Sequence, residues 1–201
     1  MEGFVRCRGL FATAVLAALL AACQPPADEP AAGGQEGDPA DPPAALEATP
    51  VDASALEALG VRNARQPVPG LITSGQPTPE QLEALRELGV TRFISLRWPE
   101  ESGAGWEEAR SEAEGFVFTR LPIAGADGLT REHVERLDAL LDQAGEGATA
   151  LYCGSSNRVG AMLALRAYWL EGASPEDALA VGRAAGLAGL EGEVRRILGI
   201  E

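Results

Sequence analysis

The chain has 201 residues and a formal net charge of −14, and 46% of its residues are hydrophobic while 5% are aromatic. This length suits one domain with accessory segments, and the acidic balance disfavours nucleic acid as a partner because phosphate backbones would be repelled. A single His and three Cys exclude a zinc finger, a two-zinc hydrolase site and a disulfide-stapled mini-domain.

The chain begins with a short basic head and an apolar run. Arg6 and Arg8 form the head, and apolar residues dominate positions 10–22. A helix that spans a bilayer needs about 20 apolar residues, so this run is too short to be a transmembrane helix. A basic head before a short apolar run is the pattern of a secretory signal peptide, which we assign to residues 1–22.

The apolar run ends in the residues LAAC (20–23). This end resembles the lipobox of bacterial lipoproteins, in which the cysteine is diacylated and becomes the mature N-terminus, and it predicts a lipid anchor on Cys23. Because Gln24 follows rather than Asp, the resemblance implies transfer to the outer membrane, with the chain at its periplasmic face. An ordinary secretory peptide cut near Ala22 is the alternative.

A long polar segment follows this cysteine. Residues 24–50 contain seven of the 14 prolines, six acidic residues and no arginine, without apolar periodicity. Such a composition cannot form a core and predicts a flexible, self-repelling spacer. We therefore assign residues 23–60 to the lipidated Cys23 and a disordered acidic linker, with a partner-binding tail as the alternative.

Cleavage and lipidation would leave one free thiol. Cys7 lies in the signal peptide and Cys23 carries the lipid, so Cys153 remains. No disulfide can then form within one mature chain. A lone thiol in an oxidising compartment is either buried and inert or chemically active.

Residues 61–201 have the pattern of one α/β domain, in which short strand-like runs alternate with helical segments. The expected strands are residues 70–73, 92–96, 116–121 and 149–153. The expected helices begin after Thr78, Thr130 and Ser174 or occupy residues 159–170 and 191–198. This alternation predicts a largely parallel sheet flanked by helices. His133 faces away from the apolar stripe of its helix and is expected to be a solvated surface residue that binds no metal.

The segment YCGSSNRVG (152–160) joins the last expected strand to an apolar helix. The Cys153 thiol stands at the carboxyl end of that strand, where the N–H groups of a loop of small residues and of a helix N-terminus can converge on one anion. Arg158 can add a planar, bidentate donor, and this positive field favours the nucleophilic thiolate. The segment predicts a phosphate cradle with a nucleophile at its base. A plain strand–helix turn with Cys153 packed as a small hydrophobe is the alternative.

Four motifs follow one another at plausible spacing: ITSGQPT (72–78), GV with FISLR (89–97), LPI (121–123) and YC with NR (152–158). This series resembles the phosphatase-like domain of bacterial beta-lactamase hydrolase-like proteins, a branch of the cysteine-based tyrosine/dual-specificity phosphatase superfamily. The resemblance covers nearly all of residues 65–171. It implies a dual-specificity-phosphatase-like three-layer fold with a mostly parallel sheet of four to five strands. It also implies hydrolysis of phosphate monoesters through a phosphocysteine. We expect no cofactor and no metal.

The resemblance assigns roles to individual residues. Cys153 would be the nucleophile and Arg158 the phosphate clamp. The remaining phosphate oxygens would be held by the loop residues Gly154, Ser155, Ser156, Asn157 and Arg158. Asp127, in a glycine-flanked loop, fits the general acid by position, although it could equally be an ordinary turn residue before Thr130. Arg97 is expected to form an ion pair, with Glu100 or Glu101.

The loop also departs from the pattern of most tyrosine phosphatases. Four residues separate Cys153 from Arg158 where five are usual, and Val159 stands where Ser or Thr is usual. Four-residue loops also occur in rhodanese-type sulfurtransferases. An inactive phosphatase-like module that binds an anion or a protein, and a sulfurtransferase, therefore remain as alternatives to a lipid-anchored phosphatase.

The sequence constrains the substrate only weakly. The expected substrate is a phosphorylated protein or a small-molecule phosphate ester. The acidic residues around the second expected strand argue against heavily anionic substrates; they are Glu100, Glu101, Glu107 and Glu108. No feature of the sequence indicates an oligomeric state.

Overall fold

A computed structural model describes residues 50–143, 145 and 147–200 of the chain. The expected signal peptide, Cys23 and the linker up to residue 49 lie outside the described residues. Within the described part, no helix has the length and apolar character needed to cross a membrane.

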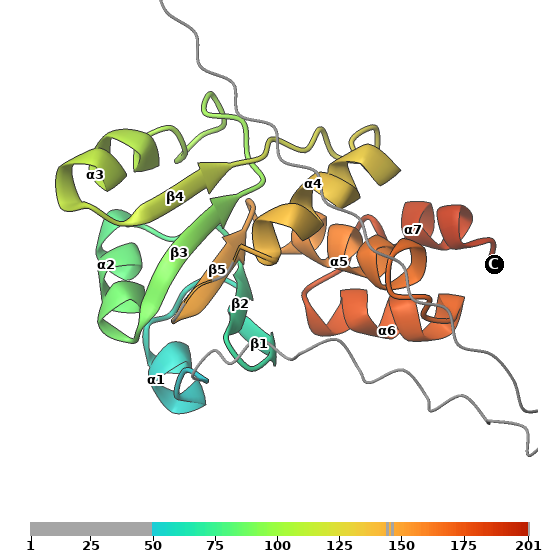
Figure 1. The fold of residues 1–201 in the computed structure, drawn as a ribbon, viewed down its shortest axis with the longest axis horizontal. Helices are drawn as coiled ribbons and strands as arrows, with labels where there is room; N and C mark the ends of the chain where they lie inside the picture. The colour runs from blue at the N-terminus through green and yellow to red at the C-terminus, as the bar shows by residue number, and fades with distance from the viewer. Residues whose placement is uncertain (1–49, 144, 146, 201) are drawn as a thin grey trace, which may run out of the picture. The chain divides into compact units, whose positions relative to one another are not determined.

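A five-stranded sheet forms the centre of the fold, with strand order β1-β2-β5-β3-β4 (Figure 1). The strands are β1 (Arg65–Val68), β2 (Leu71–Ser74), β3 (Val90–Ser95), β4 (Val117–Arg120) and β5 (Ala148–Tyr152). All neighbouring strands are parallel except β1, which pairs antiparallel with β2. The expected fold class, a mostly parallel sheet flanked by helices, is confirmed.

Seven helices surround this sheet in the described part of the chain. They are α1 (Ala53–Ala58), α2 (Pro79–Glu87), α3 (Glu107–Glu114), α4 (Arg131–Leu141), α5 (Asn157–Trp169), α6 (Pro175–Ala184) and α7 (Glu191–Leu198). Figure 1 shows α1–α3 on one side of the sheet and α4–α7 on the other. Alternate residues of the buried strands face opposite layers: Ile94 and Leu151 join the core under α4–α7, and Phe93 joins the core under α1 and α2.

The helix caps expected from the sequence are present. Thr78 forms a capping box with Gln81 at the start of α2. Thr130 accepts a hydrogen bond from the backbone N–H of His133 at the start of α4, and Ser174 caps α6. Because a cap satisfies backbone donors that the first turn leaves unpaired, these local signals fix the helix starts.

The residue patterns do not predict three of the elements. β1 contains a proline, which an edge strand tolerates because one side of it has no partner. Five of the eight residues of α3 are charged and its only apolar residues are two alanines, so it has no large apolar stripe. α1 lies inside the segment assigned to the linker, yet Leu56 and the preceding Val51 are buried against the core. The folded part thus begins about ten residues before position 61.

Close packing of α5 against α6 positions the start of α5. A Cβ on Gly160 would stand 2.1 Å from the backbone nitrogen of Leu187 and 2.6 Å from the carbonyl oxygen of Gly182. Only glycine at position 160 permits this approach. The amino end of α5 is thereby held against the segment that joins α6 to α7.

Candidate active site

The candidate site lies where β5, the central strand of the sheet, ends. Ser95 pairs with Tyr152 across β3 and β5, and the Leu96 N–H donates to the Tyr152 carbonyl oxygen at 2.8 Å. On the other side, the Cys153 N–H donates to the Ser74 carbonyl oxygen at 3.2 Å. Cys153 therefore follows the middle strand, between the ends of β2 and β3, which is where parallel α/β sheets commonly bind ligands. Its side chain is buried, with 1% of its surface exposed.

The loop after Cys153 is fixed from outside by side chains. Asn63 donates from Nδ2 to the Ser155 carbonyl oxygen at 3.0 Å, and Ser156 donates from Oγ to the Ala185 carbonyl oxygen at 2.7 Å. Ser156 adopts a left-handed conformation, with φ of 67°. Asn157 Oδ1 accepts from the backbone N–H groups of the segment between α6 and α7.

These contacts use the outward-facing carbonyls and side chains of the loop. The backbone N–H groups of residues 154–158 make no hydrogen bond to an acceptor in the part of the chain that the structure describes. Consecutive unpaired N–H groups at a helix start form a concave donor surface for an anion. The structure thus brings the loop residues expected from the sequence into one short turn above Cys153.

Arg158 is held at one end of its guanidinium. Nη1 donates to the carbonyl oxygens of Leu96, at 3.2 Å, and Ile123, at 3.0 Å. Nη1 and Nη2 also donate to the two oxygens of the Glu101 carboxylate, at 2.7 Å and 2.6 Å. The hydrogen bonds to Glu101, and in smaller part the charge of a Cys153 thiolate, raise the pKa of Arg158.

The Arg158 guanidinium therefore lies between a carboxylate and the thiol. Five N–H groups are available on a guanidinium, and those of Nε and one of Nη2 lie on the edge that Glu101 does not occupy. A Cβ on Gly154 would stand 3.8 Å from Nη2 of Arg158. This edge faces the loop and can take an oxyanion.

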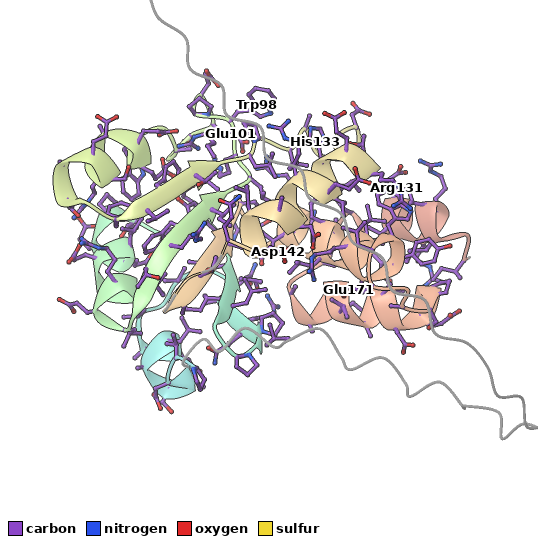
Figure 2. The ribbon with its side chains drawn as sticks, viewed as in Figure 1. Trp98, Glu101, Arg131, His133, Asp142 and Glu171 are labelled. Carbon is purple, nitrogen blue, oxygen red and sulfur yellow. The ribbon has the colours of Figure 1, made fainter. Side chains whose placement is uncertain are left out.

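Glu101, which the sequence indicates only as a partner of Arg97 and as an acidic neighbour of the site, also holds Arg158. It lies on the loop that follows β3, together with Trp98 (Figure 2). Its carboxylate also accepts from Nε of Arg97 at 3.1 Å and from the Trp98 N–H at 2.9 Å. The hydrogen bonds from Arg158, and then those from Trp98 and Arg97, lower the pKa of Glu101 to about 2. The expected ion pair of Arg97 is confirmed, with Glu101 as its partner.

A buried polar network supports this loop from below. Glu107 is fully buried and accepts from the Tyr152 hydroxyl at 3.2 Å, from Gln76 Nε2 at 3.0 Å and from Arg120 Nη2 at 2.9 Å. Gln76 accepts in turn from Nη1 of Arg97 at 2.9 Å. Burial, and then the charge of Glu107, raise the pKa of Tyr152 well above its ordinary value. The network links the residue before Cys153 to the arginine that holds Glu101.

Asp127 lies on a loop that begins at the site, but its carboxylate contacts no residue of the site. Its loop starts at Ile123, whose carbonyl accepts from Arg158, and Asp127 itself is exposed. In the described part of the chain, the Asp127 carboxylate makes no hydrogen bond or ion pair, to Arg158 or to any other residue. The end of the loop is fixed by His133, whose Nδ1 lies 2.9 Å from the Gly128 carbonyl oxygen. His133 is thus half-buried and bound to the loop rather than simply solvated.

The acidic residues expected to repel anionic substrates are mostly neutralised. Glu101 pairs with Arg158 and Arg97, and both Glu107 and Glu108 pair with Arg120. Within the described residues, no group of three or more His, Cys, Asp or Glu side chains could hold a metal ion.

Comparison with solved structures identifies the fold. The chain is similar to a DUF442 phosphatase candidate from Shewanella putrefaciens CN-32, with a TM-score of 0.56 and 22% identity over 73% of this chain and 99% of that chain. The chain has the fold of the cysteine-based phosphatases.

Two further structures support this. A phosphatase candidate from Neisseria meningitidis Z2491 matches with a TM-score of 0.54 and 22% identity, over 66% of this chain and 96% of that chain. Tk-PTP in its active form matches with a TM-score of 0.51 and 17% identity, over 67% and 95%. No family model and no curated protein matches the sequence.

Proposed function

We propose that the chain is a member of the cysteine-based tyrosine/dual-specificity phosphatase superfamily and hydrolyses phosphate monoesters through a phosphocysteine. The observation that carries this proposal is the arrangement of Arg158. One end of its guanidinium is fixed by Glu101 and two carbonyls, and the other edge faces Cys153 and the N–H groups of the loop. Such preorganised donors stabilise the charge that develops on a transferring phosphoryl group.

The reaction would run in two displacements. The Cys153 thiolate attacks phosphorus, the bond from phosphorus to the ester oxygen breaks, and the leaving oxygen takes a proton from Asp127. Water then attacks the phosphocysteine and gives a proton to the Asp127 carboxylate, the bond from sulfur to phosphorus breaks, and inorganic phosphate and the thiolate are released. Because Asp127 is exposed and makes no contact with the site, its loop must close over the substrate for this proton transfer.

The expected signal peptide supports a proposal for the cellular location of the chain. The lipobox-like end of the apolar run supports attachment to the bacterial envelope through Cys23, on the periplasmic face of the outer membrane. Cys23→Ala should move the chain from the membrane fraction to the soluble fraction and abolish incorporation of labelled palmitate. Cys7→Ala, in the same leader, is the matched control and should leave both readouts unchanged. Palmitate incorporation that persists in Cys23→Ala would contradict the anchor.

Turnover is tested on the full chain purified in detergent. Phosphate release from para-nitrophenyl phosphate should disappear in Cys153→Ser and fall about 10²- to 10³-fold in Arg158→Ala. Arg92→Ala is the matched control. Arg92 is also an arginine of the central sheet, but it lies near the amino end of β3, away from Cys153. The rate of Arg92→Ala should stay within about twofold of wild type.

The same preparation separates the alternative functions. An inactive module would bind vanadate, through the loop and Arg158, without releasing phosphate from any ester. A sulfurtransferase, which the four-residue loop would suit, would form thiocyanate from thiosulfate and cyanide. Either result would overturn the phosphatase proposal.

A further inference from the structure

One flank of the candidate site is basic in an otherwise acidic chain. No acidic residue occurs between Glu57 and Glu80, while Arg62 and Arg65 both lie in this interval. The chain as a whole carries a formal charge of −14. The two arginines occupy the turn before β1 and the first residue of β1.

Both arginines border the loop that follows Cys153. The position of a Cβ on Gly75 lies 3.1 Å from the Arg62 Cβ and also 3.1 Å from the Gly154 carbonyl oxygen. Arg62 therefore lies across Gly75 from the first residue of the loop. The next residue, Asn63, holds the Ser155 carbonyl at 3.0 Å.

The Arg65 side chain lies near the same loop, at Ser156. Its Nη1 donates to the Asn63 carbonyl oxygen at 3.1 Å. Nη1 also lies 3.0 Å from the point that a Cβ on Gly186 would occupy, and that point is 2.7 Å from Ser156 Oγ. The charged end of the Arg65 guanidinium thus lies close to Ser156.

The charge of this flank is not cancelled. Both arginines are exposed, and neither forms an ion pair with a carboxylate in the described part of the chain. The arginines in and beyond the loop differ, because Arg97, Arg120 and Arg158 are each paired with glutamate. The part of a substrate that extends beyond the loop on the Arg62 side would therefore meet uncompensated positive charge.

We propose that Arg62 and Arg65 bind a second anionic group of the substrate. This deepens the proposed phosphatase function and rests on it: the substrate class is a phosphate monoester that carries a further carboxylate or phosphate close to the ester. Guanidinium groups bind both of these anions with paired hydrogen bonds. Local positive charge also attracts such substrates to a chain whose remaining surface repels them.

The test compares substrates that differ only in the second anion. The full chain in detergent is assayed with two phosphotyrosine peptides whose flanking residues are either Glu or Gln, and with fructose 1,6-bisphosphate against fructose 6-phosphate. Wild type should prefer the doubly anionic member of each pair about three- to tenfold in kcat/KM, as expected for two exposed ion pairs. The preference should shrink as salt is added. A preference confined to one pair identifies a peptide carboxylate or a second phosphate as the anion.

The double variant Arg62→Gln/Arg65→Gln should lose the preference while its kcat/KM for para-nitrophenyl phosphate stays within about twofold of wild type. That second rate shows that the variant folds and that its loop is intact. Arg92→Gln, which removes one positive charge at the far end of β3, should keep the preference. A preference that survives in the double variant, or that Arg92→Gln also removes, overturns the proposal.

Binding separates this proposal from the phosphatase reaction. Fluorescence anisotropy with the labelled peptides is measured on Cys153→Ser, with and without the two arginine substitutions. Hydrolysis without any preference for the second anion would leave the phosphatase function standing and refute the arginine site. Arginine-dependent binding of the Glu-flanked peptide without hydrolysis by wild type would support the arginine site and refute the phosphatase function.

Discussion

The Glu101 carboxylate accepts hydrogen bonds from two guanidinium groups and one backbone N–H at once. At the scale of single residues, this makes it a positioning residue for Arg158 rather than a group that touches substrate. The negative charge of Glu101 also offsets the desolvation cost of the half-buried Arg158 guanidinium.

Glu101→Gln should weaken catalysis through Arg158. The amide presents donors to a guanidinium that is itself all donors, so at least one charge-assisted hydrogen bond, worth about 1.5–3 kcal/mol, is lost. The kcat/KM for para-nitrophenyl phosphate and the affinity for vanadate should both fall about 10- to 100-fold. Glu100→Gln, the exposed neighbour, is the control and should change neither. Unchanged vanadate affinity in Glu101→Gln would refute the positioning role.

The role of Asp127 as general acid can be tested with substrates whose leaving groups differ in their need for a proton. If Asp127 is the general acid, Asp127→Asn should slow hydrolysis of a phosphotyrosine peptide about 10²- to 10⁴-fold. The effect on para-nitrophenyl phosphate should be much smaller, because that leaving group needs little protonation. Asp142→Asn, an exposed aspartate at the end of α4, is the matched control. Equal losses on both substrates would argue for a structural role of the loop instead.

At the scale of elements, the position of the loop depends on how α5 packs. Its first residues bind the segment after α6 through Ser156 and Asn157. Glycines at 160 and 182 let α5 and α6 approach closely enough for those bonds to form. The helix that supplies the anion-binding N–H groups is thus placed by contacts at its opposite face.

Gly160→Ala should disturb both stability and site. Its Cβ would meet backbone atoms of Leu187 that cannot move independently, and overpacking of this kind costs about 1–3 kcal/mol. Urea unfolding measures the loss, and a rise in KM should accompany it as α6 is displaced. Gly192→Ala in α7 is the matched control, because nothing lies within 4 Å of the added methyl group. There we expect no loss of the free energy of unfolding, since alanine is the better helix former.

At the scale of the whole molecule, ion pairs between distant elements make stability depend on pH. The pKa of Glu101 is lowered to about 2, chiefly by its hydrogen bonds to Arg158, and Arg120 lowers the pKa of Glu108. Because the unfolded chain binds protons near pH 4.5 while folded Glu101 does not, the contribution of Glu101 is present above pH 4.5. It is lost as the pH falls from about 4.5 to about 2.

We expect wild type and Glu101→Gln to differ in how steeply the free energy of unfolding depends on pH. The free energy of unfolding of wild type should fall more steeply between pH 4.5 and pH 2 than that of Glu101→Gln. Above pH 5 the two curves should run parallel, because Glu101 stays ionised in both the folded and the unfolded wild type. Denaturant titrations at several pH values measure this. Parallel curves below pH 4.5 would contradict the assigned ion pair.

The sequence alone determined the features that depend on neighbouring residues. The caps at Thr78, Thr130 and Ser174, the parallel α/β class, and the loop from Cys153 to Arg158 all follow from local patterns, since backbone donors and apolar periodicity act over a few residues. Short elements without such a pattern, α1, β1 and α3, cannot be predicted in this way for the same reason.

Only the tertiary structure decided what surrounds the loop. Glu101 is 57 positions before Arg158, and Glu107 is 45 positions before Tyr152. These pairs meet because β3 lies beside β5 in the sheet order, which no local pattern encodes. The same order sets Arg62 and Arg65 beside residues 154–156 and leaves their charge open to solvent, whereas equivalent charges across the loop are neutralised.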